Sequence, residues 1–353
     1  MYCPMSSSSP WSLSTLPAVL SALEAVAAAG PVDTTVVHAS GAALFSLAGR
    51  AVLEVTGRDR IRFLHAMLSN DVAAMDRAGV GHGLRASLND LKGRLVADVH
   101  LYLVDQDKKT GSILALLEDE AEAPLVQMLD KYVIAEKVYF ERTAHEVLAV
   151  VGPRASEALA AAGATLPEAG EHAHCLATLG GAQVRIARQD LGGGDDLLIF
   201  VLPEGVEAVR QALAALPCPG PEVLEALRIE AALPRPGGDV TTMHIVLEGG
   251  LKDRSVSFTK GCYIGQEVIC RIDSMGTPAR LLVQMAGGDE APMPGTDLFA
   301  DGKNVGYVTS SVFSARRGGP VFLGYLKKRA NPVGGAVQVG EPDGPEAAIV
   351  AHV

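Results

Sequence analysis

The chain has 353 residues, of which 48% are apolar and 20% are charged, and its formal net charge is −11 at pH 7. This length corresponds to roughly two or three domains with sizeable cores. The acidic balance excludes a general nucleic-acid binder, which would carry a basic stripe. An anionic ligand would need a local basic pocket, because the field of the whole protein repels it.

The sequence before Arg50 contains no lysine or arginine. A secretory signal needs a basic start and a mitochondrial transit peptide needs arginines, so neither is expected. No apolar run reaches the length of a membrane span. The five cysteines include no C-x-x-C pair, so neither a disulfide framework nor a permanent iron–sulfur cluster is expected. These features predict a cytoplasmic protein without a metal site, a membrane partner or a nucleic-acid partner.

The first predicted elements follow from apolar spacing. A helical pattern covers residues 14–29 and is ended by Pro31. Alternation predicts a strand at residues 51–56, and an apolar face predicts a helix at residues 59–68. The chain therefore enters its first folded unit through a helix, a strand and a second helix.

A β-hairpin is predicted at residues 84–104, because the turn-forming sequence Asn-Asp-Leu-Lys-Gly at 89–93 separates two strand-like arms. In the second arm one face is apolar, and the other carries Asp98, His100 and Tyr102. Antiparallel sheets commonly leave one face in solvent. This polar face is therefore either an ordinary solvent face or a functional one.

Two successive sets of strands and helices follow, and they predict an α+β fold with an internal duplication. After Arg280 the pattern changes to short apolar strands between Gly/Pro/Asp turns, which predicts a small antiparallel barrel. The predicted organisation is an N-terminal helix or tail at 1–34, two α+β subdomains at 35–280 and the barrel at 281–353. The predicted strands of the two sets lie at 113–117, 137–141, 147–151, 183–187 and 197–202, the helices at 120–132, 155–162, 205–216 and 222–232, and the barrel strands at 281–285, 303–308, 321–325 and 336–339.

The segment from Lys260 to Arg271 is the richest in chemistry. Gly261 and Gly265 bracket Cys262, which suggests a positive φ or a close backbone approach to a ligand. A helix is predicted to begin near residue 264, and a thiol at a helix start close to a lysine favours the thiolate. Cys262 is therefore a candidate nucleophile or transient soft ligand, and the alternative is an inert thiol buried in a glycine turn.

Two other segments suggest sites but are better explained as loops. The glycines at 192–194 lack the Gly-Lys-Ser/Thr of a phosphate loop, so a turn is predicted there. His172 and His174 lie just before Cys175 in a Gly/Ala/Pro-rich stretch without a second ligand cluster. A surface loop is predicted at this place rather than a metal site.

The sequence Lys-Gly-Cys-Tyr-Ile-Gly-Gln-Glu at 260–267, followed by Arg271, resembles the signature of the YgfZ-type folate-binding proteins. These are similar to the T-protein, the aminomethyltransferase of the glycine cleavage system. The resemblance covers about residues 35–340. It implies two α+β subdomains and a barrel around a central folate channel. Further matching motifs are Ser69-Asn70-Asp71, Lys92-Gly93-Arg94 leading to Asp98, Lys131-Tyr132-Val133-Ile134, Arg228-Ile229-Glu230 and Gly306-Tyr307-Val308-Thr309-Ser310.

The resemblance implies a tetrahydrofolate cofactor, and the residues offer groups for it. A pterin edge presents two parallel donors, which a carboxylate accepts together. Glu230, on a mostly apolar helix, is the predicted partner, and the alternative is a surface residue or an ion pair with Arg228 or Arg235. The glutamate tail of a folate needs positive charge. The predicted cofactor-binding residues are Glu230, Arg228, Lys260, Gly261, Gln266, Glu267 and Arg271.

The resemblance also implies a role in assembling or repairing iron–sulfur clusters in client proteins, with Cys262 and Asp98 as the chemically active residues. Asp98 matches an acid of the T-protein family near the reactive nitrogens of the folate. A folate-dependent aminomethyltransferase that uses Asp98 is therefore the alternative. A module that senses folate without chemistry is a third hypothesis.

Overall fold

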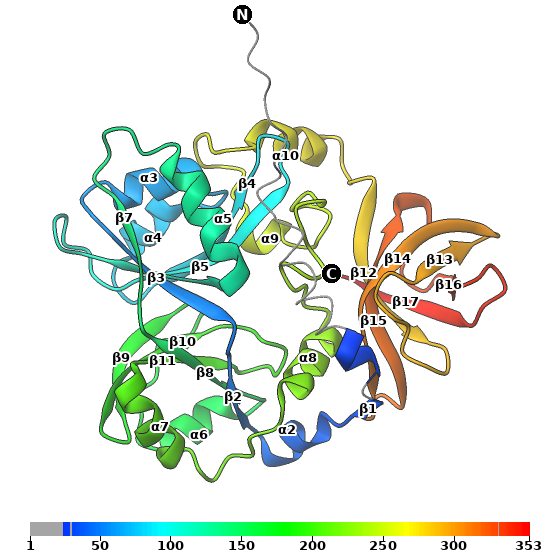
Figure 1. The fold of residues 1–353 in the computed structure, drawn as a ribbon, viewed down its shortest axis with the longest axis horizontal. Helices are drawn as coiled ribbons and strands as arrows, with labels where there is room; N and C mark the ends of the chain where they lie inside the picture. The colour runs from blue at the N-terminus through cyan, green and yellow to red at the C-terminus, as the bar shows by residue number, and fades with distance from the viewer. Residues whose placement is uncertain (1–23, 29, 331) are drawn as a thin grey trace, which may run out of the picture.

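The computed structural model describes residues 24–28, 30–330 and 332–353, so much of the helix predicted at 14–29 lies outside the described residues. Residues 24–28 are helical. Figure 1 shows two α+β units stacked on one side and a β-barrel on the other, with residues 221–274 between them.

The first unit is built on a five-stranded antiparallel sheet in the order β4-β5-β6-β3-β7. Alternation in β3 places Ala51, Leu53 and Val55 in a core with residues of the covering helices, as the sequence pattern predicts. The elements are β3 (Arg50–Thr56), α3 (Arg60–Met67), α4 (Val72–Ala78), β4 (Gly83–Asn89), β5 (Leu95–Leu103), β6 (Ile113–Glu118), α5 (Asp119–Asp130) and β7 (Tyr139–Arg142).

The second unit repeats the topology of the first. In each, one strand leads to helical structure and then to a three-stranded meander whose last strand pairs with the first: β6 with β3, and β11 with β8. This shared order supports the predicted duplication. The second unit contains α2 (Thr35–Ser40), β2 (Ala43–Ser46), β8 (Glu146–Val151), α6 (Ala155–Ala161), β9 (His174–Leu179), β10 (Ala182–Arg188), β11 (Leu197–Val201), the 3-10 helix η1 (Pro203–Gly205) and α7 (Val206–Ala212).

The C-terminal unit is a closed six-stranded antiparallel barrel, as predicted. It closes because β14 pairs with both β13 and β15. The short strand β1 (Pro31–Val32) joins the far end of β14 in parallel. The barrel elements are β12 (Arg280–Gly287), β13 (Asp297–Ala300), β14 (Lys303–Ser314), β15 (Gly319–Lys327), η2 (Lys328–Ala330), β16 (Ala336–Val339) and β17 (Glu346–His352).

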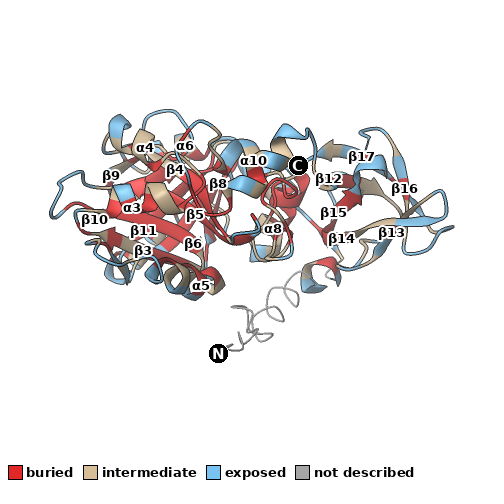
Figure 2. Cartoon of the chain, turned by 90° about the horizontal axis from the view of Figure 1, so that it is seen from above, coloured by how far each residue is buried: buried red, intermediate tan, exposed pale blue. Residues whose placement is uncertain are grey.

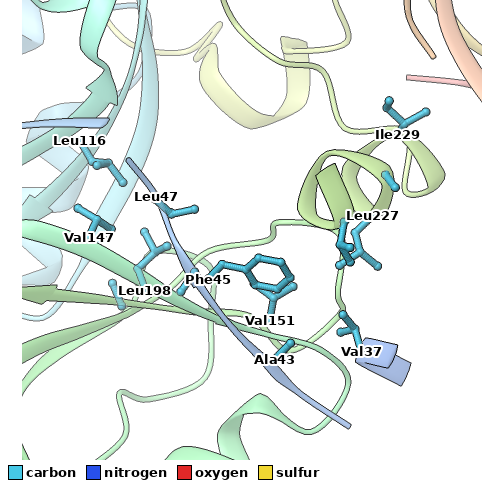
Figure 3. Close-up of a cluster of buried hydrophobic side chains, with 14 of the residues drawn as sticks. Val37, Ala43, Phe45, Leu47, Leu116, Val147, Val151, Leu198, Leu227 and Ile229 are labelled. Atoms are coloured by element: carbon cyan, nitrogen blue, oxygen red, sulfur yellow. The ribbon is translucent and has the colours of Figure 1, made fainter. Parts of the chain in front are cut away.

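Three helices lie between the units: α8 (Pro221–Glu230), α9 (Lys252–Ser255) and α10 (Gln266–Ser274). Figure 3 shows α8 against one shared core, where Leu227 lies near Val151 of β8 and Phe45 of β2. The same core includes Leu116 of β6 and Tyr325 of β15, so it joins all three units. Figure 2 shows that buried ribbon is concentrated in the sheets of the α+β units and in the segments between them and the barrel. None of the described helices is long and apolar enough to cross a membrane.

Candidate functional site

A cavity of about 190 Å³ lies where the two α+β units meet α8. Its lining contains five arginines and four carboxylates, so it carries a net charge of +1 within a chain of −11. This is the local basic pocket that an anionic ligand of an acidic protein requires. The charged lining residues are Arg50, Arg85, Arg228, Arg235, Arg254, Asp98, Glu118, Asp190 and Glu225.

Asp98 is the predicted catalytic residue that the cavity contains. The polar face of β5 turns to the second unit instead of solvent, and Asp98 and His100 are only 5% and 6% exposed. The Arg85 Nε donates to both oxygens of Asp98, at 2.8 and 3.1 Å. Desolvation by burial alone would raise the pKa of Asp98, but the charge of Arg85 and the His100 ring outweigh it and hold that pKa well below its usual value. Asp98 is therefore a permanent carboxylate at neutral pH.

Arg228 is the other predicted residue in the cavity lining, but its guanidinium is already engaged. It donates to Glu225 Oε2 at 2.8 Å, to the Leu233 carbonyl at 3.1 Å and to the carboxylate of buried Asp239 at 2.6 Å. Asp239 also accepts from Thr309 and Ser310 of β14. Arg228 therefore shapes the cavity wall and links it to the barrel.

Glu118, at the end of β6, has an unused acceptor at the cavity. Its buried Oε1 accepts no hydrogen bond, although Arg50 and Arg235 lie 3.1 and 3.8 Å away. A buried carboxylate oxygen without a donor is costly unless a ligand supplies one. The strand pattern placed Glu118 just past the predicted strand and gave it no role.

Glu230, the predicted pterin partner, does not line the cavity. It accepts from Thr34 at 3.1 Å, from Ser314, and from both Nε and Nη2 of Arg316 at 2.9 and 2.6 Å. Neither predicted alternative holds, because Glu230 is buried and its partner is Arg316. Residues two apart on a helix point about 200° apart, so α8 cannot turn both Arg228 and Glu230 to one cavity. The carboxylate instead fastens α8 to the barrel.

Lys260 is buried against α3 and is not part of the cavity lining. Its Nζ donates to the carbonyl of His65, to that of Leu68 at 2.6 Å and to that of Asn70 at 3.2 Å. These are carbonyls at and beyond the C-terminal end of α3, where a cation is favoured. Burial lowers the pKa of Lys260 to about 8. The role that this geometry supports is a helix cap.

Cys262, predicted to be catalytic, and the remaining predicted cofactor-binding residues also lie outside the cavity lining. Cys262 and Gly261 are exposed in the turn before α10, and Glu267 and Arg271 are exposed on that helix. Gln266, the first residue of α10, is partly buried. The structure thus brings together Asp98 and Arg228, and it separates both from the signature segment.

The prediction of a surface loop around His172 and His174 is wrong. His172 and His174 are 5% and 3% exposed, and His174 begins strand β9. No local pattern indicates this burial, because the short polar stretch around the two histidines has no apolar alternation. Among the described residues, no group of His, Cys, Asp and Glu could hold a metal ion.

The hairpin register could have identified Arg85. Once the turn at 89–93 is recognised, pairing places Arg85 opposite His100 and Ser87 opposite Asp98. Alternate residues of β4 then share the polar face of β5. No pattern in the neighbouring sequence indicated that the remaining residues belong to the cavity, because they come from other elements: Arg50, Glu225 and Arg254.

Comparison with known proteins agrees with this architecture. Residues 280–352 match the glycine cleavage T-protein C-terminal barrel domain. A putative chloroplastic transferase of Arabidopsis thaliana is 28% identical, over 86% of this chain and 69% of that protein. The tRNA-modifying protein YgfZ of Yersinia pestis is 27% identical, over 72% of this chain and 74% of its own length. Bacterial aminomethyltransferases match at similar identity.

Among solved structures, aminomethyltransferase T of the Bartonella henselae glycine cleavage system has the same fold. Its TM-score is 0.79 at 20% identity, over 90% of this chain and 87% of that chain. At this identity the likeness concerns the fold alone. The chain is thus similar in fold to an aminomethyltransferase T, and its residues 280–352 match the glycine cleavage T-protein C-terminal barrel domain.

Proposed function

We propose that the chain binds tetrahydrofolate in the cavity beside Asp98. The observation that carries this proposal is the buried Oε1 of Glu118, which accepts no hydrogen bond although it lies in a pocket of net positive charge. A pterin edge offers paired N–H donors, which match a carboxylate with a free oxygen. Glu118 therefore replaces Glu230 as the proposed pterin partner.

The volume of the cavity suggests which part of a bound folate would lie inside it and which part would lie outside. Pockets for drug-sized ligands usually measure about 300–1,000 Å³, whereas this cavity has about 190 Å³. It fits a fused-ring head and leaves the negatively charged tail outside. Arg235 and Arg254, with side chains 27% and 45% exposed, are the proposed tail partners. Bound tetrahydrofolate would supply nitrogen atoms that carry one-carbon groups, while Asp98 would orient them.

We further propose that the chain acts in the cytoplasm as an accessory protein for iron–sulfur cluster assembly or repair in client proteins. The support is the Lys-Gly-Cys-Tyr-Ile-Gly-Gln-Glu signature together with the exposure of its thiol. Cys262 lies on a turn that a macromolecular partner reaches without entering the cavity. A transient sulfur or iron species on Cys262 would then be handed over at the surface.

Calorimetry of tetrahydrofolate with the purified full chain tests the folate proposal. We expect one site per chain, lost when Arg235 and Arg254 are both replaced by glutamate. A double replacement of Lys328 and Arg329, which are exposed in η2 and lie outside the cavity lining, is the charge-matched control. Absence of binding to the wild type would contradict the proposal.

Complementation tests the accessory role. Cells that lack the protein and receive Cys262→Ser should lose activity of iron–sulfur enzymes, while the purified variant keeps its folate affinity. If Cys262→Ser restored the iron–sulfur enzyme activity fully, a role for the thiol would be contradicted. If a variant that cannot bind folate still restored this activity, the two proposals would be separated.

Folate-dependent aminomethyl transfer is the second candidate. The observation that favours it is the burial of the Asp98 carboxylate in the cavity of a chain with the fold of an aminomethyltransferase. An aminomethyl-transfer assay with the glycine cleavage partner proteins decides the matter. Turnover that disappears in Asp98→Asn and persists in Cys262→Ser would favour this enzyme over the accessory protein.

A further inference from the structure

A chain of buried ionisable groups leads away from the cavity through β5. His100 Nε2 lies 3.5 Å from Asp98 Oδ2, and His100 Nδ1 lies 2.7 Å from His172 Nε2. The two imidazoles are stacked, with ring centroids 5.1 Å apart. His172 Nδ1 then faces Glu171 Oε1 at 3.9 Å. Asp98 and His100 line the cavity, whereas the Glu171 side chain is 51% exposed to solvent.

The contacts favour one resting tautomer for each ring. Asp98 is a carboxylate and accepts only, so His100 carries its proton on Nε2 and presents a lone pair at Nδ1. The 2.7 Å contact needs one donor, which must be His172 Nε2–H. His172 Nδ1 is then an acceptor directed toward Glu171. Desolvation by burial lowers the pKa of both histidines, and the positive charge of Arg85 lowers each pKa further. Both rings are therefore neutral at pH 7.

The chain crosses the boundary between the two α+β units. Asp98 and His100 belong to β5 of the first unit, whereas His172 precedes β9 of the second. His172 has φ of +63°, which is rare for a residue with a side chain. Its amide donates to the carbonyl of Arg188, which holds this strained turn in place. The fold therefore maintains an unfavourable backbone where it brings the two rings together.

We propose that Asp98, His100, His172 and Glu171 form a proton relay between the cavity and the protein surface. In the inward direction, Glu171 gives a proton to His172 Nδ1, and His172 passes its Nε2 proton to His100 Nδ1. His100 then releases its Nε2 proton to a ligand atom beside Asp98. Each ring gains one proton and loses one, so both remain neutral, while Glu171 becomes a carboxylate.

The gap at the outer end is short enough for the relay to close. Rotation of the Glu171 side chain or one bridging water spans the 3.9 Å. Partial burial raises the pKa of the Glu171 carboxyl, so a larger fraction of it carries a proton at a given pH than for an ordinary surface carboxyl. Arg85, Asp98 and Arg254 are the other charged groups that act on His172. The relay rests on the proposed function, since its inner end serves the ligand of the cavity.

Nitrogen-15 NMR of histidine-labelled protein tests the relay without a ligand. We expect both rings to carry the proton on Nε2, with a resolved coupling between His100 Nδ1 and His172 Nε2. Glu171→Gln should shift the nitrogen resonances of His100 as well as those of His172, because one proton path joins them. A proton found on His172 Nδ1, or a shift confined to His172, would overturn the proposal.

Stopped-flow mixing with tetrahydrofolate in weakly buffered indicator solution tests the transfer itself. We expect a proton phase that His172→Gln slows by about 100-fold, the scale of general acid–base transfer. The dissociation constant should stay within about twofold, because the side chain does not line the cavity. His174→Gln is the matched control, since this buried ring contacts Arg185 and the His82 carbonyl and lies outside the chain of groups.

The remaining outcomes separate the relay from the folate proposal. If tetrahydrofolate binds but the proton phase is absent or unchanged in His172→Gln, the relay is overturned and folate binding stands. If tetrahydrofolate does not bind, the proposed function fails, and the NMR measurement still decides whether the four groups share a proton path.

Discussion

Gly265 lies against the carbonyl oxygen of Asp90, so that a Cβ atom added to the glycine would sit only 2.4 Å from it. The signature turn thereby packs against the tip of the β4–β5 hairpin, which carries Asp98 on its second strand. Gly265 also has φ of +80°, which side chains rarely adopt. This packing joins the signature segment to the hairpin.

Gly265→Ala should destabilise the protein by about 1–3 kcal/mol, because the methyl group overpacks the turn and the backbone is strained. Gly261→Ala is the control within the same signature. A Cβ at Gly261 meets no heavy atom within 4 Å, and its φ is not positive, so a change within about 0.5 kcal/mol is expected. Urea unfolding measures both values, and equal losses would contradict the assigned contact.

Glu118→Gln should weaken tetrahydrofolate binding by about 1.5–3 kcal/mol, the range for a charged hydrogen bond. Glu230→Gln should leave the affinity unchanged and instead destabilise the fold by about 1–3 kcal/mol, since it weakens the contacts with Arg316 and Ser314. Calorimetry and urea unfolding of both variants provide the comparison. A loss of affinity in Glu230→Gln alone would restore the prediction made from the sequence.

The cysteines should differ in reactivity according to their exposure. Cys262 and Cys218 are exposed, whereas partial burial raises the pKa of the Cys175 and Cys270 thiols. Iodoacetamide should therefore modify the exposed pair roughly tenfold faster. Because Cys262 lies outside the cavity lining, bound tetrahydrofolate should not slow its modification. Mass spectrometry with and without tetrahydrofolate will measure this.

Acid should destabilise the protein below about pH 6.5. Burial lowers the pKa of His174 and His244 to about 4 in the folded state, so the unfolded chain binds more protons between pH 6.5 and 4. Stability is therefore lost as the pH falls through this window, by up to about 3 kcal/mol for each ring. Urea unfolding of His244→Gln should show a smaller loss between pH 7 and 4.5. His38→Gln, on an exposed residue, should behave as the wild type.

Local pattern was enough to predict the elements that carry the site. Alternation predicted the hairpin and showed that Asp98 and His100 share one face of β5, but it could not show that the second unit covers that face. The phase of α8 could have separated Arg228 from Glu230, because positions two apart on a helix point in different directions. The family resemblance implied that both residues contact the ligand, although their positions on the helix point them in different directions.

Other features depend on contacts between distant parts of the chain. Lys260 caps a helix that ends near Leu68, and this role needs the fold that brings the two together. His172 adopts a backbone conformation that neighbouring residues do not predict. That Glu118 Oε1 accepts no hydrogen bond can be recognised only once the positions of all surrounding donors are known.

The pairing of β1 with β14 has a consequence for synthesis on the ribosome. Val32 leaves the exit tunnel early, but its partner Ser314 is among the later residues to emerge. The hydroxyl of Thr34 likewise donates to Glu230, which is synthesised much later. Each α+β unit can gather most of its strands while translation continues, because domains fold as units in chain order. Residues 31–34, in contrast, reach their final contacts only after their partners in the barrel and in α8 have been synthesised.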